Sequence, residues 1–399
     1  MTGPAKELDT SGADAGHRDD RTKPRLAPAK WVRLKLDNVE ERFPLPLYLV
    51  TEGCRYVWQS LKNCVKLPLG RGLYRDDRLV FFRKYILHLV GLRRVWAITC
   101  VMDKALEGAC SQALFTMRTI DWARASGLQY LHTPFAKIFH ADRPMQEWTA
   151  AWEALFNLGA GEEPCNGRRR GVIENTFTSV NLDLCFGSHH RKQELLGGFR
   201  ALIPEFRHKY YLNKYPRTTD AVTVAVHIRR GDVSSAENTH MYTSTERVLQ
   251  IVSAVKSILN SKSVPHGICV YSQGALEEFD DLRPLGAEFF LDADPIWTIQ
   301  ELVEADILIV AKSYFSYYAG MISDGIKIFE PFSGIDPTRI IPQSPDSGLQ
   351  GPSSSWRYSV FSAMDGWLPC QEDDTFDHSA FERQLSLLLE KKENAKADS

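Results

Sequence analysis

The segment Val222–Asp232 reads V-T-V-A-V-H-I-R-R-G-D, a buried-strand pattern that ends in a cluster of charged groups. It begins with β-branched and apolar residues, as strands of a parallel sheet do when both faces are covered. Burying a charge without a partner costs several kcal/mol, so two adjacent arginines at a strand end predict a bound anion with more than one charge. Ligand crevices in open parallel sheets form at the carboxyl ends of the strands, which predicts where this anion binds.

The pleat of the strand separates the two arginines. Alternation places His227 and Arg229 on one side and Arg230 on the other. The planar guanidinium of arginine suits two-point contact with phosphate oxygens. We therefore expect Arg229, with His227, to bind the anion. Arg230 either binds it too or forms a structural salt bridge, for example with Asp232.

Strand and helix patterns alternate through both halves of the chain. The first half predicts a strand at Arg93–Val101, a glycine turn, a helix with Leu114, Met117 and Ile120 on one face, a strand at Leu128–His132, a helix with a core-packing stripe from Trp148 to Phe156, and a helix from Arg191 that becomes loop-like by Tyr215. The second half predicts strands at Val222–Ile228, Gly267–Tyr271, Glu288–Leu291, Asp306–Ala311 and Lys327–Phe329, and helices at Thr243–Leu259, Ala275–Leu282, Thr298–Ala305 and Ser316–Ile322. Such alternation is typical of α/β proteins whose parallel sheets have helices on both faces.

These patterns divide the chain into four parts. Residues 1–29 are rich in Gly, Asp, Lys, Arg and Pro and are predicted to be disordered. Residues 30–215 form a first α/β domain, and Pro216 marks the boundary to a second α/β domain at 216–345. Residues 346–399 are expected to form a loop and a helix over Phe376–Glu390, which packs back on the body and frays beyond it.

Composition excludes several classes of protein. With 399 residues, 44% hydrophobic and 25% charged, the chain has the composition of a globular protein. A net charge of −2 gives no global basic field, so nucleic acid is not favoured as a partner. No apolar run approaches the roughly 18 residues of a membrane span. The polar start lacks a secretory signal, so the expected location is cytoplasmic, or the secretory lumen if an N-terminal anchor is missing. Eight cysteines without a C-x-x-C pair signal no zinc site.

Two further strand ends carry polar clusters. Ser272 and Gln273 precede Gly274 after one predicted strand, where they suit a turn whose backbone touches a ligand. The segment Ala311–Gly320 places serines at a strand-to-helix turn, where free N–H groups and the helix dipole favour an anion. Ordinary turn and cap formation also explains these serines. Taken with the first cluster, the three ends predict a site for a phosphate-bearing ligand.

Asp292-Ala293-Asp294 is a competing signal. Two carboxylates at this spacing can hold a divalent cation under a sugar-nucleotide diphosphate. The spacing is common by chance, and Pro295 follows in what reads as a loop. We therefore do not assign a metal to this pair.

Four segments together resemble motifs of the α1,2-, α1,6- and protein-O-fucosyltransferase superfamily. They are His227–Asp232 (H-I-R-R-G-D), Tyr271–Gln273, Leu302–Asp306 and Ser313–Tyr318 (S-Y-F-S-Y-Y). The loop Gly108–Gln112 (G-A-C-S-Q) is similar to a degenerate form of the superfamily's G-x-G-N-Q loop. The resemblance extends over residues 93–332.

The resemblance implies a GT-B-like fold of two facing Rossmann-like domains with parallel sheets. It also implies GDP-fucose as donor, a glycan or glycoprotein as acceptor on the side of the first domain, inversion at the anomeric carbon, and no metal or other cofactor. Arg229 is then the catalytic residue that stabilises the leaving GDP. The implied donor-binding residues are His227, Arg229, Arg230, Asp232, Ser272, Gln273, Ser313, Phe315 and Ser316, and the implied acceptor or donor loop includes Gly108, Ser111 and Gln112.

Two alternatives stay open from the sequence. One is a transferase of the same fold that uses another nucleotide sugar. The other is a catalytically inactive relative that binds sugar or protein; the decay of the Gly108 loop favours it, whereas intact His227 and Arg229 argue against it. The candidates for a general base are Asp232 and Glu237.

Overall fold

The computed structural model describes residues 95–102, 107–167, 170–176, 189–217, 219–330, 366–370 and 375–397. All of them belong to one compact unit, Leu49–Ser399. The segment 1–29 that was predicted to be disordered lies outside the described residues, as do Arg93 and Arg94 of the first expected strand and much of the expected loop after residue 345.

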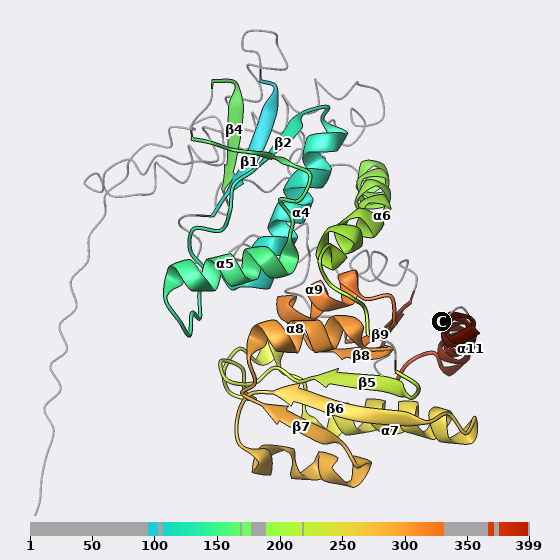
Figure 1. Cartoon of the computed structure of the whole chain (residues 1–399). Helices are drawn as coiled ribbons and strands as arrows, with labels where there is room; N and C mark the ends of the chain where they lie inside the picture. The colour runs from blue at the N-terminus through green and yellow to red at the C-terminus, as the bar shows by residue number, and fades with distance from the viewer. Residues whose placement is uncertain are drawn as a thin grey trace, which may run out of the picture. The chain divides into compact units, whose positions relative to one another are not determined.

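Within the described residues, four parallel strands form the first sheet, in the order β3-β2-β1-β4 (Figure 1). They are β1 (Ala97–Val101), β2 (Gln129–His132), β3 (Glu163–Pro164) and β4 (Val172–Thr176). The helices of this half are α4 (Ala109–Ala125), α5 (Met145–Phe156) and α6 (His189–Tyr211). The predicted helical faces are confirmed, since Leu114, Met117, Ile120, Trp148 and Trp152 are all buried.

Six described parallel strands form the second sheet, in the order β10-β9-β8-β5-β6-β7. They are β5 (Val222–His227), β6 (His266–Ser272), β7 (Glu288–Leu291), β8 (Ile307–Val310), β9 (Ile326–Phe329) and β10 (Trp367–Pro369). The connecting elements are the short 3-10 helix η2 (Thr239–Met241), α7 (Thr245–Ser261), the 3-10 helix η3 (Leu276–Leu285), α8 (Pro295–Glu304), α9 (Tyr314–Ile322) and, at the C-terminal end, α11 (His378–Ala397). The predicted α/β class with parallel sheets is confirmed.

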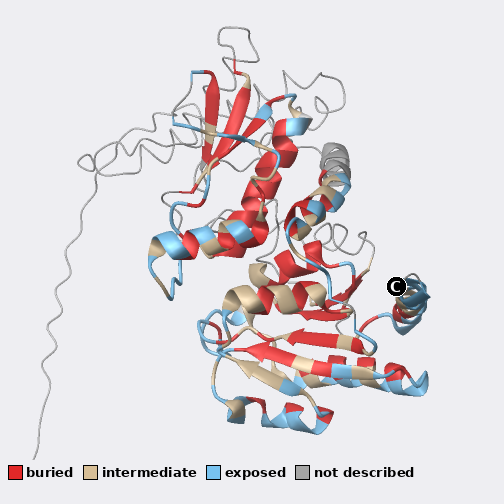
Figure 2. Cartoon of the chain, in the orientation of Figure 1, coloured by how far each residue is buried: buried red, intermediate tan, exposed pale blue. Residues whose placement is uncertain are grey.

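The core of this half lies between the second sheet and the helices on one of its faces. Val224, Val226 and Ile228 point into it from β5 and its end, and they pack with apolar residues of α7, η3 and α11. Phe381 and Leu385 bring α11 into the same cluster, which confirms that the tail helix packs back on the body. Helices α8 and α9 lie against the opposite face (Figure 1). The central strands of the two sheets are largely buried, whereas the edge strands β3 and β7 are not (Figure 2).

Several elements differ from the prediction. Helix α4 begins at Ala109, so most of the predicted loop Gly108–Gln112 is its first turn. Helix α8 begins at Pro295, three residues before the predicted start at Thr298, because Asp294 caps it and a proline fits the first helical position. Helix α11 continues to Ala397 where fraying was expected, and strands β3, β4 and β10 were not predicted.

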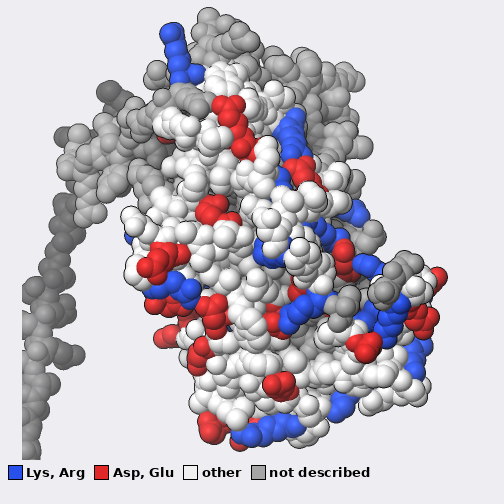
Figure 3. All heavy atoms as spheres, viewed as in Figure 1, with Lys and Arg blue, Asp and Glu red and all other residues white. Residues whose placement is uncertain are grey.

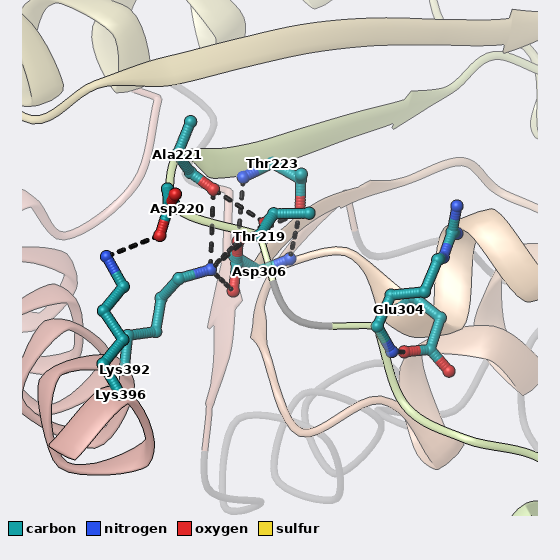
Figure 4. A network of polar contacts seen from close by, with 9 residues as sticks. Thr219, Asp220, Ala221, Thr223, Glu304, Asp306, Lys392 and Lys396 are labelled. Atoms are coloured by element: carbon teal, nitrogen blue, oxygen red, sulfur yellow. Dashed lines mark hydrogen bonds and ion pairs between the residues drawn. The ribbon is translucent and has the colours of Figure 1, made fainter. Parts of the chain in front are cut away.

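A polar network at the amino ends of β5 and β8 connects the tail helix to the sheet (Figure 4). Asp306 accepts hydrogen bonds from the backbone N–H (2.8 Å) and the hydroxyl (3.0 Å) of Thr223. Lys392 of α11 lies 2.9 and 2.8 Å from the two carboxylate oxygens of the same residue. The side chains of Asp306 and Lys392 are 14% and 19% exposed, so water screens this pair only partly. By contrast, the neighbouring Lys396–Asp220 pair is largely exposed.

We expect Asp306→Ala to lower the free energy of unfolding by about 2–3 kcal/mol, because it leaves Lys392 without its carboxylate partner in a largely buried position. Lys396→Ala, which breaks the exposed pair on the same helix, should change it by less than about 0.5 kcal/mol. Urea unfolding of both variants and wild type measures the difference. Equal effects of the two substitutions would show that the network does not hold the tail helix.

Candidate functional site

The second sheet changes direction between two adjacent strands. From β5 the chain adds β6 and β7 on one side, and then returns to add β8, β9 and β10 on the other. In an open α/β sheet, helices diverge at such a reversal and leave a crevice at the carboxyl ends of the two strands. His227 and Arg229 follow β5, and Ser313 and Phe315 follow β8. The topology thus brings together four residues that were predicted from different parts of the sequence.

Arg229 spans this crevice. Its Nη1 lies 3.4 Å from the Ser313 hydroxyl, and Nε and Nη2 donate to the Asp232 carboxylate at 3.2 and 2.7 Å. The hydrogen bond from Arg229 lowers the pKa of Asp232 and outweighs its partial burial. Ser313 is the N-cap of α9 and accepts from the N–H of Phe315, so the guanidinium lies at the positive end of a helix. The Arg229 guanidinium, the Ser313 hydroxyl and the N-terminus of α9 together form a cradle for an anion.

The salt bridge predicted for Arg230 is instead made by Arg229. Arg230 is buried and donates to the carbonyl oxygens of Arg229 (2.9 Å) and Thr243 (3.1 Å). Its guanidinium also lies 4.6 Å from the centre of the Tyr242 ring. These contacts hold the segment before α7 against the strand end. Arg230 therefore has a structural role in this conformation, because its donors are directed into the protein, and its contact with a ligand stays a prediction.

His227 is held as a neutral imidazole. Burial, with the nearby charge of Arg229, lowers the pKa of His227 from 6.5 to about 3. Its ring lies 5.2 Å from that of Phe315, and its buried Nδ1 has no hydrogen-bond partner among the described residues. His227 and Arg229 also line a small pocket together with apolar residues of the core. A neutral, partly unsatisfied imidazole beside a pocket suits hydrogen bonding to a ligand, not proton transfer at neutral pH.

Three predicted site residues serve the turns of the site. The Ser272 hydroxyl donates to the Ile228 carbonyl at 2.8 Å, and the fully buried Ser316 hydroxyl donates to Ala311 at 3.2 Å. Both hydroxyls bond carbonyl oxygens of the protein in this conformation, and direct contact of these serines with a ligand stays a prediction. Gln273 is exposed and lies close to Gly231, which has a φ of +82°. Side chains other than hydrogen are strained at this positive φ, so the turn favours glycine.

The first sheet has an equivalent reversal, between β1 and β4. The residues that follow β1 at this point include Glu107 and Gly108. The buried Gln112 donates from Nε2 to the carbonyl oxygens of Glu107 (2.9 Å) and Lys137 (2.8 Å). Its side chain therefore fixes Glu107 against the loop that follows β2.

Glu107 is a candidate residue that the motif comparison missed. Burial raises the pKa of its carboxyl group, and a hydrogen bond with Ser111 and the charge of Arg229 oppose this rise only in part. The charge of Arg229, which follows a strand of the second sheet, thus acts on a carboxyl group that follows a strand of the first sheet. The sequence held one signal for this role: a carboxylate directly before Gly108, after a strand whose carboxyl end is predicted to line a crevice.

The loop between β2 and α5 also approaches this site. The Arg143 guanidinium forms an ion pair with Asp294 at 2.6 Å, and His140 contributes to lowering the pKa of Asp232. Asp294 caps α8 by accepting from the N–H groups of Ile296 and Trp297, both at 2.9 Å. The carboxylate of Asp294 is thus occupied, which makes the Asp292/Asp294 spacing a helix-start signal.

The two sequence candidates for a base differ in position. Asp232 is engaged by Arg229, whereas Glu237 is exposed in a turn with Ser234, whose N–H donates to the Glu237 carbonyl at 2.9 Å. The described residues contain no group of three or more His, Cys, Asp and Glu side chains placed to hold a metal ion. Lys and Arg are interspersed with Asp and Glu on the face in Figure 3. No helix in the described part of the chain is long and apolar enough to cross a membrane.

No protein-family model and no curated protein matches the chain. The chain is similar in structure to the fucosyltransferase NodZ from Bradyrhizobium, at 11% identity and a TM-score of 0.30, over 57% of this chain and 92% of that one. It is similar to the E. coli heptosyltransferase WaaC at 12% identity and a TM-score of 0.31, over 58% and 88% of the two chains. The dodecameric glycosyltransferase TibC from enterotoxigenic E. coli is similar at 11% identity and a TM-score of 0.36, over 62% of each chain. Similarities this weak give no information on activity, so the function must be inferred from the residues of this chain.

Proposed function

We propose that the chain is a GT-B-type glycosyltransferase that moves a sugar, with inversion, from a nucleoside diphosphate to a hydroxyl group. The donor that its motifs favour is GDP-fucose. The observation that supports this most strongly is the cradle of Arg229, Ser313 and the α9 N-terminus at the reversal point between β5 and β8. Parallel α/β sheets bind nucleotides at this position, and a guanidinium beside a helix N-terminus suits a diphosphate.

In this reaction the acceptor oxygen attacks the anomeric carbon from the side opposite the diphosphate. The bond between the anomeric carbon and the phosphate oxygen breaks, and its electron pair stays on the diphosphate. Arg229 stabilises that developing charge, because its guanidinium is already positioned before the reaction begins. Donor binding requires the guanidinium to exchange Asp232 for phosphate oxygens. The Asp232 side chain is 44% exposed, so the carboxylate can be solvated by water after this exchange.

Glu107 is the proposed acceptor of the proton that leaves the attacking hydroxyl. It lies at the reversal point of the first sheet, and Arg229 influences its charge from the second. A general base works best when its pKa approaches the working pH, and burial moves the pKa of Glu107 in that direction. His227 stays neutral and is proposed to hold the nucleotide.

Competition binding with GDP, UDP and ADP tests the donor assignment. If the donor is GDP-fucose, GDP should displace a labelled nucleotide at least about tenfold more effectively than UDP or ADP, which corresponds to about 1.4 kcal/mol. A preference for UDP or ADP would be consistent with a transferase but would contradict GDP-fucose as the donor. If none of the three nucleotides bound, the proposed function would be contradicted.

A further inference from the structure

The loop of residues 133–144, between β2 and α5, holds one large aromatic ring in solvent. Phe139 is 46% exposed, whereas its neighbour Ile138 is 1% exposed. An exposed aromatic ring can stack on a ligand, and Phe139 is attached through its backbone to Glu107. The proposed transfer chemistry makes no use of Phe139.

The loop around Phe139 is fixed by contacts on both sides. The Phe139 N–H donates to the carbonyl of Glu107 at 3.1 Å, and the buried Gln112 side chain holds Lys137. Farther along the loop, Arg143 forms its ion pair with Asp294. Phe139 is thus exposed in a well-defined position. Its own backbone is bonded to Glu107, the proposed base.

Phe139 forms a pair with the next residue. The ring of His140 lies 4.4 Å from that of Phe139, with an angle of 67° between the planes. His140 has a φ of +58°, a left-handed conformation that side chains other than glycine adopt infrequently. His140 is also electrostatically coupled to Asp232, the partner of Arg229. The Phe139–His140 pair therefore lies beside Glu107, and its loop also contacts the second half of the chain through the Arg143–Asp294 ion pair.

We propose that Phe139, supported by His140, is the platform on which a sugar ring of the acceptor stacks, so that the acceptor is a glycan. This inference rests on the proposed function and names the acceptor class of the same site. One face of a pyranose ring carries C–H groups with slight positive charge, and the face of an aromatic ring is negative. Glu107 is bonded to the same loop through its backbone carbonyl, and its carboxylate is the group proposed to accept the proton from a hydroxyl of the stacked sugar.

A protein surface as occupant fits less well. The large hydrophobic side chains that are exposed in the described part of the chain are Phe139, Leu212, Tyr215 and Leu387, and among these only Phe139 lies in the loop of residues 133–144. A stable protein interface buries about 800 Å² on each partner. A single ring flanked by charged groups matches one monosaccharide and is too small for such an interface.

Saturation-transfer-difference NMR on the full chain with GDP tests this proposal. The probes are lactose, N-acetyllactosamine and chitobiose, which present different pyranose faces. We expect at least one of them to bind wild type, and Phe139→Ala to weaken that binding by about fivefold or more. Phe139→Tyr keeps the ring and should bind as wild type does. Tyr215→Ala removes an exposed aromatic ring from another segment and should also leave sugar binding unchanged.

Three results separate this inference from the proposed function. Sugar binding that is equal in Phe139→Ala and wild type would overturn the platform. Normal GDP binding with no signal from any of the three sugars would also overturn it, and would leave the transferase with a non-glycan acceptor. Sugar binding that depends on Phe139 without any GDP binding would support the platform and overturn the transferase.

Discussion

Arg229→Ala should reduce kcat/KM for sugar transfer by about 10²-fold or more. Removing one preorganised group that stabilises developing charge costs enzymes about 10²–10³-fold, and Arg229 is the cation that spans the β5–β8 crevice. The kcat/KM of Arg229→Lys should lie between those of wild type and Arg229→Ala, because an ammonium keeps the charge and loses the two-point geometry. Steady-state transfer rates with varied donor concentration give these values, and calorimetry should show weaker GDP binding in the alanine variant.

The fold should tolerate this substitution. Asp232 loses its partner, but its side chain is 44% exposed, so water replaces the lost contact at small cost. Arg283→Ala is the matched control, since it removes a surface arginine whose ion pair is with Asp280 in η3. It should leave transfer unchanged. If Arg229→Ala kept activity within a few-fold of wild type while folded, the leaving-group role would be wrong, and a non-catalytic nucleotide- or sugar-binding protein would be the better interpretation.

The sequence indicated the position of His227 and Arg229 at the carboxyl end of a buried strand because two independent regularities converge there. The apolar run of Val222–His227 predicts a buried strand, and charged residues at its end have few stable positions other than a ligand site. The reversal in strand order, which places Ser313 next to Arg229, depends on pairings between segments far apart in the chain. Alternating strand and helix patterns are compatible with several strand orders, so sequence alone left this neighbour relation open.

The roles of individual polar residues were harder to predict, because a hydroxyl or carboxylate can bind a ligand or its own backbone. Ser316 and Ser272 both turned inward to bond carbonyl groups. Asp294 was read as part of an acidic pair in a loop, although an Asp-Pro sequence before an apolar period is also a helix start. In these three cases the side chain bonds a nearby backbone group, since a backbone group without a hydrogen-bond partner at a buried turn or helix end is costly.

Glu107 shows the opposite error. The sequence predicted site residues at Gly108, Ser111 and Gln112 of the glycine loop. It did not include Glu107, the residue directly before them. Gln112 does act there, through its bonds to Glu107 and Lys137, and Ser111 bonds the Glu107 carboxyl. The loop residues thus position a carboxylate that the motif itself does not include. A positioning role of this kind depends on contacts with residue 137, which no local pattern predicts.

Glu107→Gln should lower kcat for transfer by about 10²-fold or more and leave the KM for the donor nearly unchanged. Glutamine has the shape of the carboxylate and can still bond Ser111, but it does not accept the acceptor's proton. General-base catalysis contributes about 10²–10⁴-fold. Glu237→Gln is the matched control, because Glu237 is the exposed carboxylate that the sequence offered as an alternative base. It should retain full activity, and the reverse result would assign the base to Glu237.

The pH dependence provides a second, independent test of Glu107. Burial raises the pKa of this group above its usual 4.5, and only the deprotonated form accepts a proton. Transfer by the wild type should therefore rise with pH through this raised pKa, so that the acid limb of the kcat profile lies above pH 4.5. His227, with a pKa of about 3, is neutral throughout this range and adds no limb of its own. Glu107→Gln should lose the acid limb along with most of its rate. A slow variant that kept the limb would show that another group titrates, and that Glu107 acts on the acceptor only through its position.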